Sequence, residues 1–73
     1  MKARVTFSGT YRQCKPIVEL LSEHSSCVSE VEHLDGWRYD IFYDDYEVAE
    51  QMLMLAGWEN GKISDIPVRL EKW

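Results

Sequence analysis

The middle of the chain decides the order of its elements, because residues 35–47 read DGWRYDIFYDDYE. Asp35-Gly36 is a two-residue sequence typical of a tight β-hairpin. Apolar residues then occupy every second position: Trp37, Tyr39, Ile41 and Tyr43. This period of two predicts a half-buried strand, with Arg38, Asp40 and Phe42 on its other face. Asp44 suits a helix N-cap, with Glu47 three residues later, so a helix is expected to follow.

Downstream, the sequence predicts that second helix and a last strand. Apolar residues recur at helical spacing: Val48, Ala49, Met52, Leu53, Leu55 and Ala56. Gly57 suits the position just after a helix end, and residues 59–62 predict a turn. Ile66, Val68 and Leu70 then alternate with polar residues. Because Pro67 has no N–H, we expect this strand at a sheet edge, or with Pro67 at its start.

Upstream, Ala3, Val5 and Phe7 alternate with polar residues and predict a first strand that ends at residues 8–10. A helix is expected within residues 11–25. It can begin near Lys15 with Pro16 in its first turn, the alternative we favour. It can also begin at a capping box formed by Thr10 and Gln13, with Pro16 bending the helix.

A second strand is expected from Cys27 to Leu34, before the Asp35-Gly36 turn. Val28 and Val31 lie at opposite parity in this segment, which predicts either a bulge or an irregular strand. The order β-α-β-β-α-β favours an α+β fold of the ferredoxin-like kind. It would have one four-stranded antiparallel sheet with both helices on one face. The 73 residues are expected to form a single domain, residues 1–73, and this fold hosts many unrelated functions.

Charge is unevenly distributed along the chain, which has a net charge of −5. Residues 1–15 carry +4, whereas residues 30–50 carry −7. The acidic block would repel phosphate and attract a basic protein surface, so neither nucleic acid nor an anionic membrane is expected as a direct ligand. An equally weighted alternative is that the basic start and the acidic middle pair across neighbouring strands. The cations Lys2, Arg4, Arg38 and Arg69 can gather on one sheet face, but the aromatic platform of RNA-recognition domains is missing.

No motif for catalysis, metal or cofactor binding is present. The soft ligands Cys14, His24, Cys27 and His33 lack the close spacing of a zinc site, and there is no glycine-rich phosphate loop. We therefore expect no enzyme activity, no metal and no cofactor; Cys14, His33 and an aspartate brought together by folding would reopen the question. With no signal-like or membrane-spanning apolar stretch, we expect a cytoplasmic protein with reduced thiols.

Aromatic residues among acids suit protein recognition. The predicted partner-binding residues are Asp40, Asp44, Asp45, Glu47, Tyr43, Tyr46 and Phe42. Our hypothesis is a non-enzymatic, acidic protein-binding module that covers a basic surface of a larger protein. If that surface binds nucleic acid, the module would be an inhibitor; in charge and size it resembles the small acidic inhibitors that phages direct at host nucleic-acid-binding enzymes. The alternative is a homodimeric ferredoxin-like module that regulates or binds a small ligand.

Overall fold

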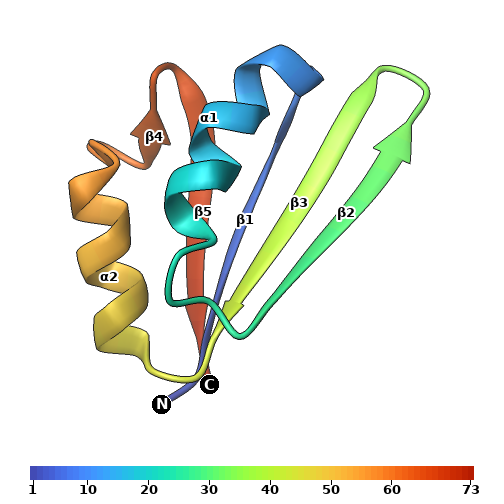
Figure 1. Cartoon of the computed structure of the whole chain (residues 1–73). Coiled ribbons are helices and arrows are strands. Elements are labelled where there is room, and N and C mark those ends of the chain that lie inside the picture. Colours follow the sequence, from blue (N-terminus) through green and yellow to red (C-terminus); the bar gives the residue numbers. More distant parts are fainter.

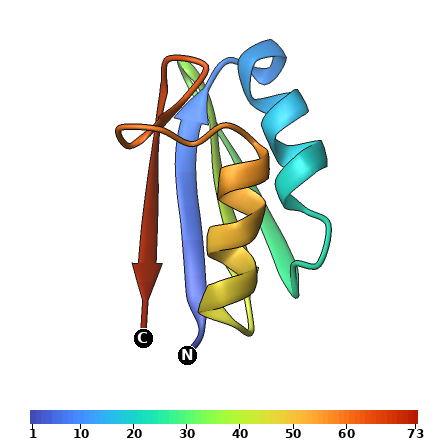
Figure 2. The same cartoon turned by 90° about the vertical axis from the view of Figure 1, so that its left-hand side faces the viewer.

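One antiparallel sheet and two helices make up the protein in a computed structural model that describes residues 1–73 (Figure 1). The elements are β1 (Ala3–Gly9), α1 (Tyr11–Leu21), β2 (Cys27–His33), β3 (Gly36–Tyr43), α2 (Tyr46–Leu55), β4 (Lys62–Ile63) and β5 (Ile66–Lys72). The strand order is β2-β3-β1-β5-β4, and both helices lie on the same face of the sheet (Figure 2). The predicted α+β class is confirmed, whereas the four-stranded sheet is wrong because β4 adds a fifth strand.

The core lies between this sheet and the two helices. Val5 on β1 is paired with Ile41 of β3 and with Leu70 of β5. The buried residues are all hydrophobic: Ala3, Val5, Phe7, Cys14, Ile17, Leu21, Tyr39, Ile41, Tyr43, Ala49, Met52, Leu53, Ile63, Ile66 and Val68. The alternation predicted for the first, third and last strands is therefore confirmed, because every second residue of each strand points into this core.

Helix α1 begins earlier than the favoured interpretation placed it. Thr10 is its N-cap and accepts a hydrogen bond from the Gln13 N–H at 3.1 Å, while the Gln13 side chain accepts one from the Thr10 N–H at 3.0 Å. The start near Lys15 is therefore wrong, and the capping box formed by Thr10 and Gln13 is confirmed. Two helix-end N–H groups gain partners at Thr10, whereas Pro16 only removes one hydrogen bond on the exposed side of the helix.

Helix α2 begins one residue later than predicted. Its N-cap is Asp45, whose carboxylate accepts a hydrogen bond from the Glu47 N–H at 3.0 Å, whereas Asp44 lies exposed in the preceding loop. Two neighbouring aspartates are equally good caps by residue type, so the end of β3 decides which one is used. Gly57 follows the helix with φ of 85°, as predicted. Neither helix has the length and apolar character that a membrane-spanning helix requires.

The turn between β2 and β3 also differs from the prediction by one residue. Its two residues are Leu34 and Asp35, and Gly36 is the first residue of β3, paired with His33. Gly36 has φ of 152°, and a Cβ atom there would lie 2.7 Å from the Gly9 carbonyl oxygen. Glycine is needed at this position because β1 passes close to the backbone of β3.

The additional strand β4 forms a second hairpin with β5. Residues 59–62 form the predicted turn, with Asn60 and Gly61 at positive φ, and Ser64 and Asp65 form a further two-residue turn at φ of 48° and 69°. Lys62 pairs with Pro67, so only the first residues of β5 have an outer partner. Pro67 is the second residue of β5, close to its start as expected.

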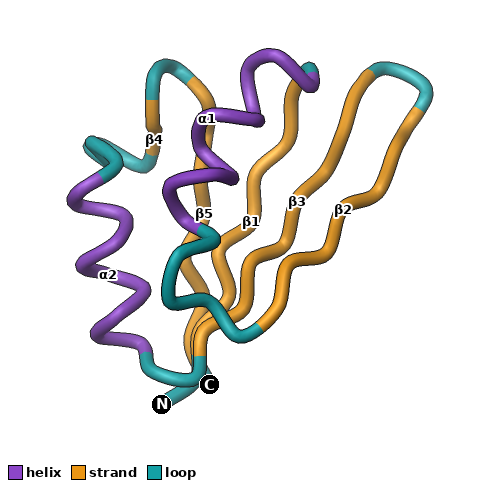
Figure 3. The backbone as a smooth tube through the Cα atoms, viewed as in Figure 1, coloured by secondary structure: helices purple, strands orange, loops and turns teal.

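Strand β2 is an edge strand that the helices leave uncovered (Figure 3). Its register with β3 is continuous from Cys27 paired with Phe42 to His33 paired with Gly36, so the predicted bulge is absent. No β2 side chain is buried. Val28 and Val31 lie on opposite faces because neither face of this strand belongs to the core, and the segment therefore has no need of an alternating pattern.

Candidate functional site

Four of the predicted partner-binding residues lie together at the start of α2. Asp44 and Glu47 are exposed, Asp45 caps the helix, and Tyr46 is its first residue. Asp44 and Asp45 also line a surface hollow of about 560 Å³ between the loop that follows α1 and helix α2. This end of the molecule presents carboxylates beside an accessible depression.

Tyr46 is half-buried between groups of opposite charge. Its hydroxyl donates a hydrogen bond to the Glu50 carboxylate at 3.3 Å, and the Lys72 ammonium lies 4.7 Å from the centre of its ring. Burial, followed by the charge of Glu50, raises the pKa of the phenol. Tyr46 therefore connects α2 to the end of β5 and leaves only part of its ring for a partner.

Asp40 and Phe42 lie on the opposite, open face of the sheet. The Thr6 hydroxyl donates a hydrogen bond to the Asp40 carboxylate at 2.8 Å, and the Arg38 guanidinium donates one at 3.2 Å. Burial alone would raise the pKa of Asp40, but these two hydrogen bonds, together with the positive charges of Arg38 and Arg4, outweigh it and lower the pKa. Asp40 is thus an ionised, hydrogen-bonded residue on this face, separated by the whole sheet from the acids at α2.

Tyr43 belongs to the core, with 1% of its surface exposed. Its hydroxyl donates a hydrogen bond to the carbonyl oxygen of Leu21 at the end of α1, and burial raises its pKa to about 12. The seven predicted residues are therefore divided between α2, the core and the open sheet face. The division follows from strand geometry, because successive residues of β3 point to opposite faces.

The side of the sheet covered by the helices carries most of the carboxylates. We call this region the acidic helix side and define it as Glu19, Glu23, Glu30, Glu32, Asp44, Asp45, Glu47 and Glu50. Glu30 and Glu32 belong to it because β2 pairs them with Tyr39 and Trp37, whose side chains lie on the helix side. Exposed apolar side chains accompany these acids on α2: Met54 is 69% exposed and Leu55 is 74% exposed.

The open face of the sheet has the opposite charge. Its cations, which we call the basic sheet face, are Lys2, Arg4, Arg38, Lys62 and Arg69, and the carboxylates that its strands carry are Asp40 and Glu71. The Arg4 guanidinium forms an ion pair with Glu71 at 2.8 Å. Sequence reasoning noted that four of these cations can gather on one face, but gave them no role. The sequence pattern that could have identified this face is the alternation of these cations with buried residues in three strands.

The cysteine and histidine residues lie on several different elements. Cys14 is a buried residue of α1, whereas Cys27 is exposed on β2, and both thiols are free. His24 lies in the loop after α1 and His33 at the end of β2, both exposed. No group of three or more histidine, cysteine, aspartate and glutamate residues is arranged to hold a metal ion. Comparisons with protein-family models, with curated proteins and with solved structures found no match.

Proposed function

We propose that this protein is a non-enzymatic binding module that docks its acidic helix side against a basic surface of a larger protein. The observation that carries this proposal is the separation of charge. Two of the thirteen acidic residues, Asp40 and Glu71, lie on the open sheet face, and the others lie on the helix side or in turns. If the partner's basic surface binds nucleic acid, the docked module acts as a competitive inhibitor.

The proposed contact is centred on α2. Asp44, Glu47 and Glu50 supply a field that attracts cations, and such steering typically raises association rates by about 10- to 1000-fold at low salt. Met54 and Leu55 lie on the same helix and supply apolar anchors. Burying each of them in a partner would stabilise the complex by about 1.5–3 kcal/mol, which is more than exposed ion pairs usually contribute.

The arrangement of the elements supports a ferredoxin-like module with one added strand. The four long strands lie in the order β2-β3-β1-β5, with both helices on one face, and β4 extends the sheet by two residues. Such a fold leaves one sheet face open, so the module has two distinct surfaces available for contacts.

The test is capture of the partner from source lysate on the immobilised protein, with elution by a salt gradient and quantification by mass spectrometry. Asp44→Lys combined with Glu47→Lys reverses the charge beside α2 and leaves the capping Asp45 in place. We expect this variant to retain the partner at least tenfold less well than the unmodified protein, and the captured partner to have a basic contact surface.

The matched control is Asp35→Lys combined with Glu59→Lys. It changes the net charge by the same amount at two exposed turn residues outside the acidic helix side. This control is expected to retain the partner, and circular dichroism of both variants checks that they fold. Equal retention by the two double variants would show that docking does not use the acids at α2, and would contradict the proposal.

Exposure of β2 favours a second candidate, the homodimeric module. Val28 and Val31 are 38% and 45% exposed, and the outer edge of β2 has no partner strand. Pairing of two β2 strands would extend the sheet, but it would also bring Glu30 and Glu32 of one copy close to those of the other, which costs stability. Light scattering distinguishes the candidates: a dimer mass at micromolar concentration that Val31→Lys reduces to the monomer would support self-association through β2.

A further inference from the structure

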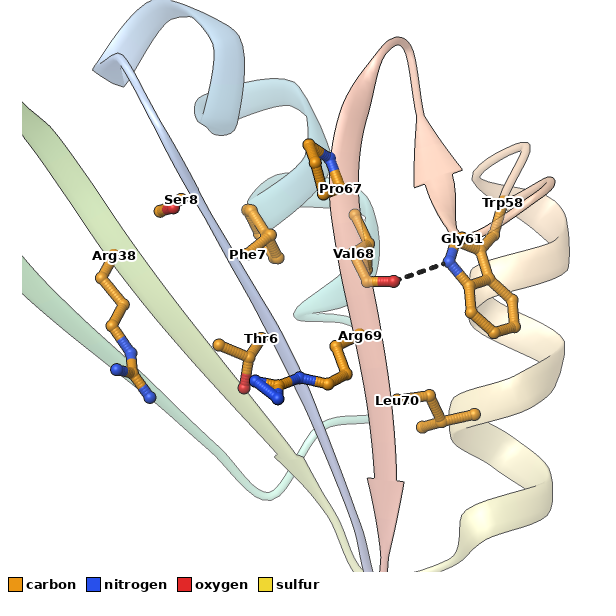
Figure 4. Close-up of a pocket in the computed structure, with 10 residues that line it drawn as sticks. All are labelled: Thr6, Phe7, Ser8, Arg38, Trp58, Gly61, Pro67, Val68, Arg69 and Leu70. Carbon is orange, nitrogen blue, oxygen red and sulfur yellow. Dashed lines mark hydrogen bonds between the residues drawn. The ribbon is translucent and has the colours of Figure 1, made fainter.

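A hollow of about 580 Å³ lies on the open sheet face, opposite the acidic helix side. Its floor includes Thr6 and Ser8 of β1, and Arg38 and Arg69 stand on the two neighbouring strands (Figure 4). Toward the outer edge of the sheet it extends past Pro67 to Trp58, whose indole N–H donates a hydrogen bond to the Val68 carbonyl oxygen at 3.0 Å. Its volume is within the range of small-molecule sites, about 300–1000 Å³.

Strand register directs both arginines to the same part of β1. Arg69 of β5 is paired with Thr6, and Arg38 of β3 is paired with Ser8. Figure 4 shows the Arg69 side chain lying across β1, with its guanidinium beside Thr6. Strands two places apart are separated by about 10 Å, a distance that two extended arginine side chains leaning inward can close around one small anion.

Arg69, like Lys2 and Lys62, forms no ion pair on this face, although its charge helps to lower the pKa of the nearby Glu71 carboxyl. The two ion pairs of the protein join Arg4 to Glu71 and Arg38 to Asp40, so both carboxylates of the face already have cationic partners. None of the side-chain hydrogen bonds involves Arg69 or Ser8, and both residues are exposed. An incoming anion therefore meets a free guanidinium and a free hydroxyl without displacing an existing contact at either group.

We propose that this hollow binds a phosphorylated small molecule of about nucleotide size. The planar guanidinium of Arg69 donates two parallel hydrogen bonds to the phosphate and Ser8 donates a third, while Arg38 stays paired with Asp40. A phosphate group occupies only part of the hollow. The organic part of the ligand fills the remainder, over Pro67 and toward Trp58.

The net charge of −5 does not prevent this binding. At physiological ionic strength charges are screened over about 8 Å, so the open face responds mainly to its own charges. Those charges are the five cations of the basic sheet face and the two carboxylates Asp40 and Glu71. The order of charges along the sequence does not show this surplus of cations on the open face.

The test is a titration of the ¹⁵N-labelled protein with inorganic phosphate and with AMP, followed by amide chemical shifts at constant ionic strength. We expect both probes to shift the amides of residues 6–8, 61, 68 and 69, with AMP binding more tightly because its nucleoside occupies the rest of the hollow. Arg69→Gln should lower the affinity for both probes at least tenfold, and Arg69→Lys should lower these affinities less.

Arg12→Gln is the matched control, since it removes one exposed positive charge on α1, outside the hollow. Its affinities for phosphate and for AMP are expected to stay within twofold of those of the unmodified protein. A thermal melt of each variant checks folding. Equal losses in Arg12→Gln and Arg69→Gln, or shifts spread over the whole surface, would overturn the proposal. Binding of a single-stranded oligonucleotide at the same residues without binding of AMP would also overturn it and assign the face to nucleic acid.

Discussion

The two faces of the sheet differ in what they bury and in the charge they carry. The face toward α1 and α2 buries Val5, Ile41 and Tyr43 completely and is bordered by carboxylates. The open face buries no side chain completely and carries arginines that flank β1. Because neighbouring residues of β3 belong to different faces, one short segment contributes to both. Charges close in sequence are therefore separated by the sheet, and distant ones are brought together.

The largest expected effect comes from two adjacent residues of β3. Ile41→Ala removes a fully buried side chain and should lower the free energy of unfolding by about 2–5 kcal/mol. Phe42→Ala removes a half-buried side chain from the open face and should cost only about 1 kcal/mol. Urea denaturation of both variants measures the difference. Equal costs would mean that the open face is covered in solution, for example by a second copy.

The next largest effect concerns the close approach of β1 and β3, which places Arg38 beside Ser8. Gly36→Ala combines an unfavourable φ of 152° with a Cβ atom 2.7 Å from the Gly9 carbonyl oxygen. It should destabilise the protein by about 1–3 kcal/mol. Gly57→Ala is a suitable comparison, because its φ is also positive but no atom lies within 4 Å of the added Cβ. A smaller cost at Gly36 than at Gly57 would contradict the close contact.

Alkaline pH should weaken the helix-covered face specifically. Burial raises the pKa of Tyr43 to about 12, and burial followed by Glu30 raises that of Tyr39 to about 12. Both phenols are neutral in the native and unfolded states below about pH 9. Between pH 10 and 12 the unfolded chain loses these protons while the native state keeps them, so stability falls as pH rises. Urea midpoints measured from pH 9 to 12 should decrease steadily.

Tyr43→Phe is the control for this titration. It loses the hydrogen bond to Leu21 at every pH, and it should show a shallower decrease between pH 10 and 12 than the unmodified protein. The Cys14 thiol, whose pKa is raised by burial, contributes in the same direction in both proteins. An unchanged slope in Tyr43→Phe would show that Tyr43 does not titrate with a raised pKa.

The smallest effect is expected on the open face. Thr6→Val removes the hydrogen bond to Asp40 and should cost about 0.5–1 kcal/mol at neutral pH. The pKa of Asp40 should rise, because burial raises it and Thr6 is the first of the groups that oppose burial. A carboxyl whose pKa is lower in the native state than in the unfolded state stabilises the native state at pH values above both pKa values. Raising the pKa of Asp40 in the native state therefore removes part of this stabilisation at neutral pH. A carbon-detected titration of the Asp40 carboxyl measures the shift, and an unchanged value would contradict the contact.

The candidate site was predicted only in part. Asp44, Asp45, Tyr46 and Glu47 are adjacent on a helix start, so their proximity followed from the chain itself. Asp40 and Tyr43 were assigned to the same surface because they are close in sequence, although β3 directs them to opposite sides of the sheet. Odd and even positions of a strand point to opposite faces. Applying this rule to charged residues as well as to apolar residues would have placed Asp40 and Tyr43 on different faces.

Local patterns in the sequence determined the strands β1, β3 and β5, the second helix and the turn at residues 59–62, because alternation, helical spacing and turn residues act over a few positions. Tertiary structure alone decided the rest. The end of β3 decided that Asp45, rather than Asp44, starts α2. Strand order left β2 without a covering helix. The register of β1 with β3 and β5 brought Arg38 and Arg69 to one hollow, since hydrogen bonding between strands joins residues that no local pattern relates.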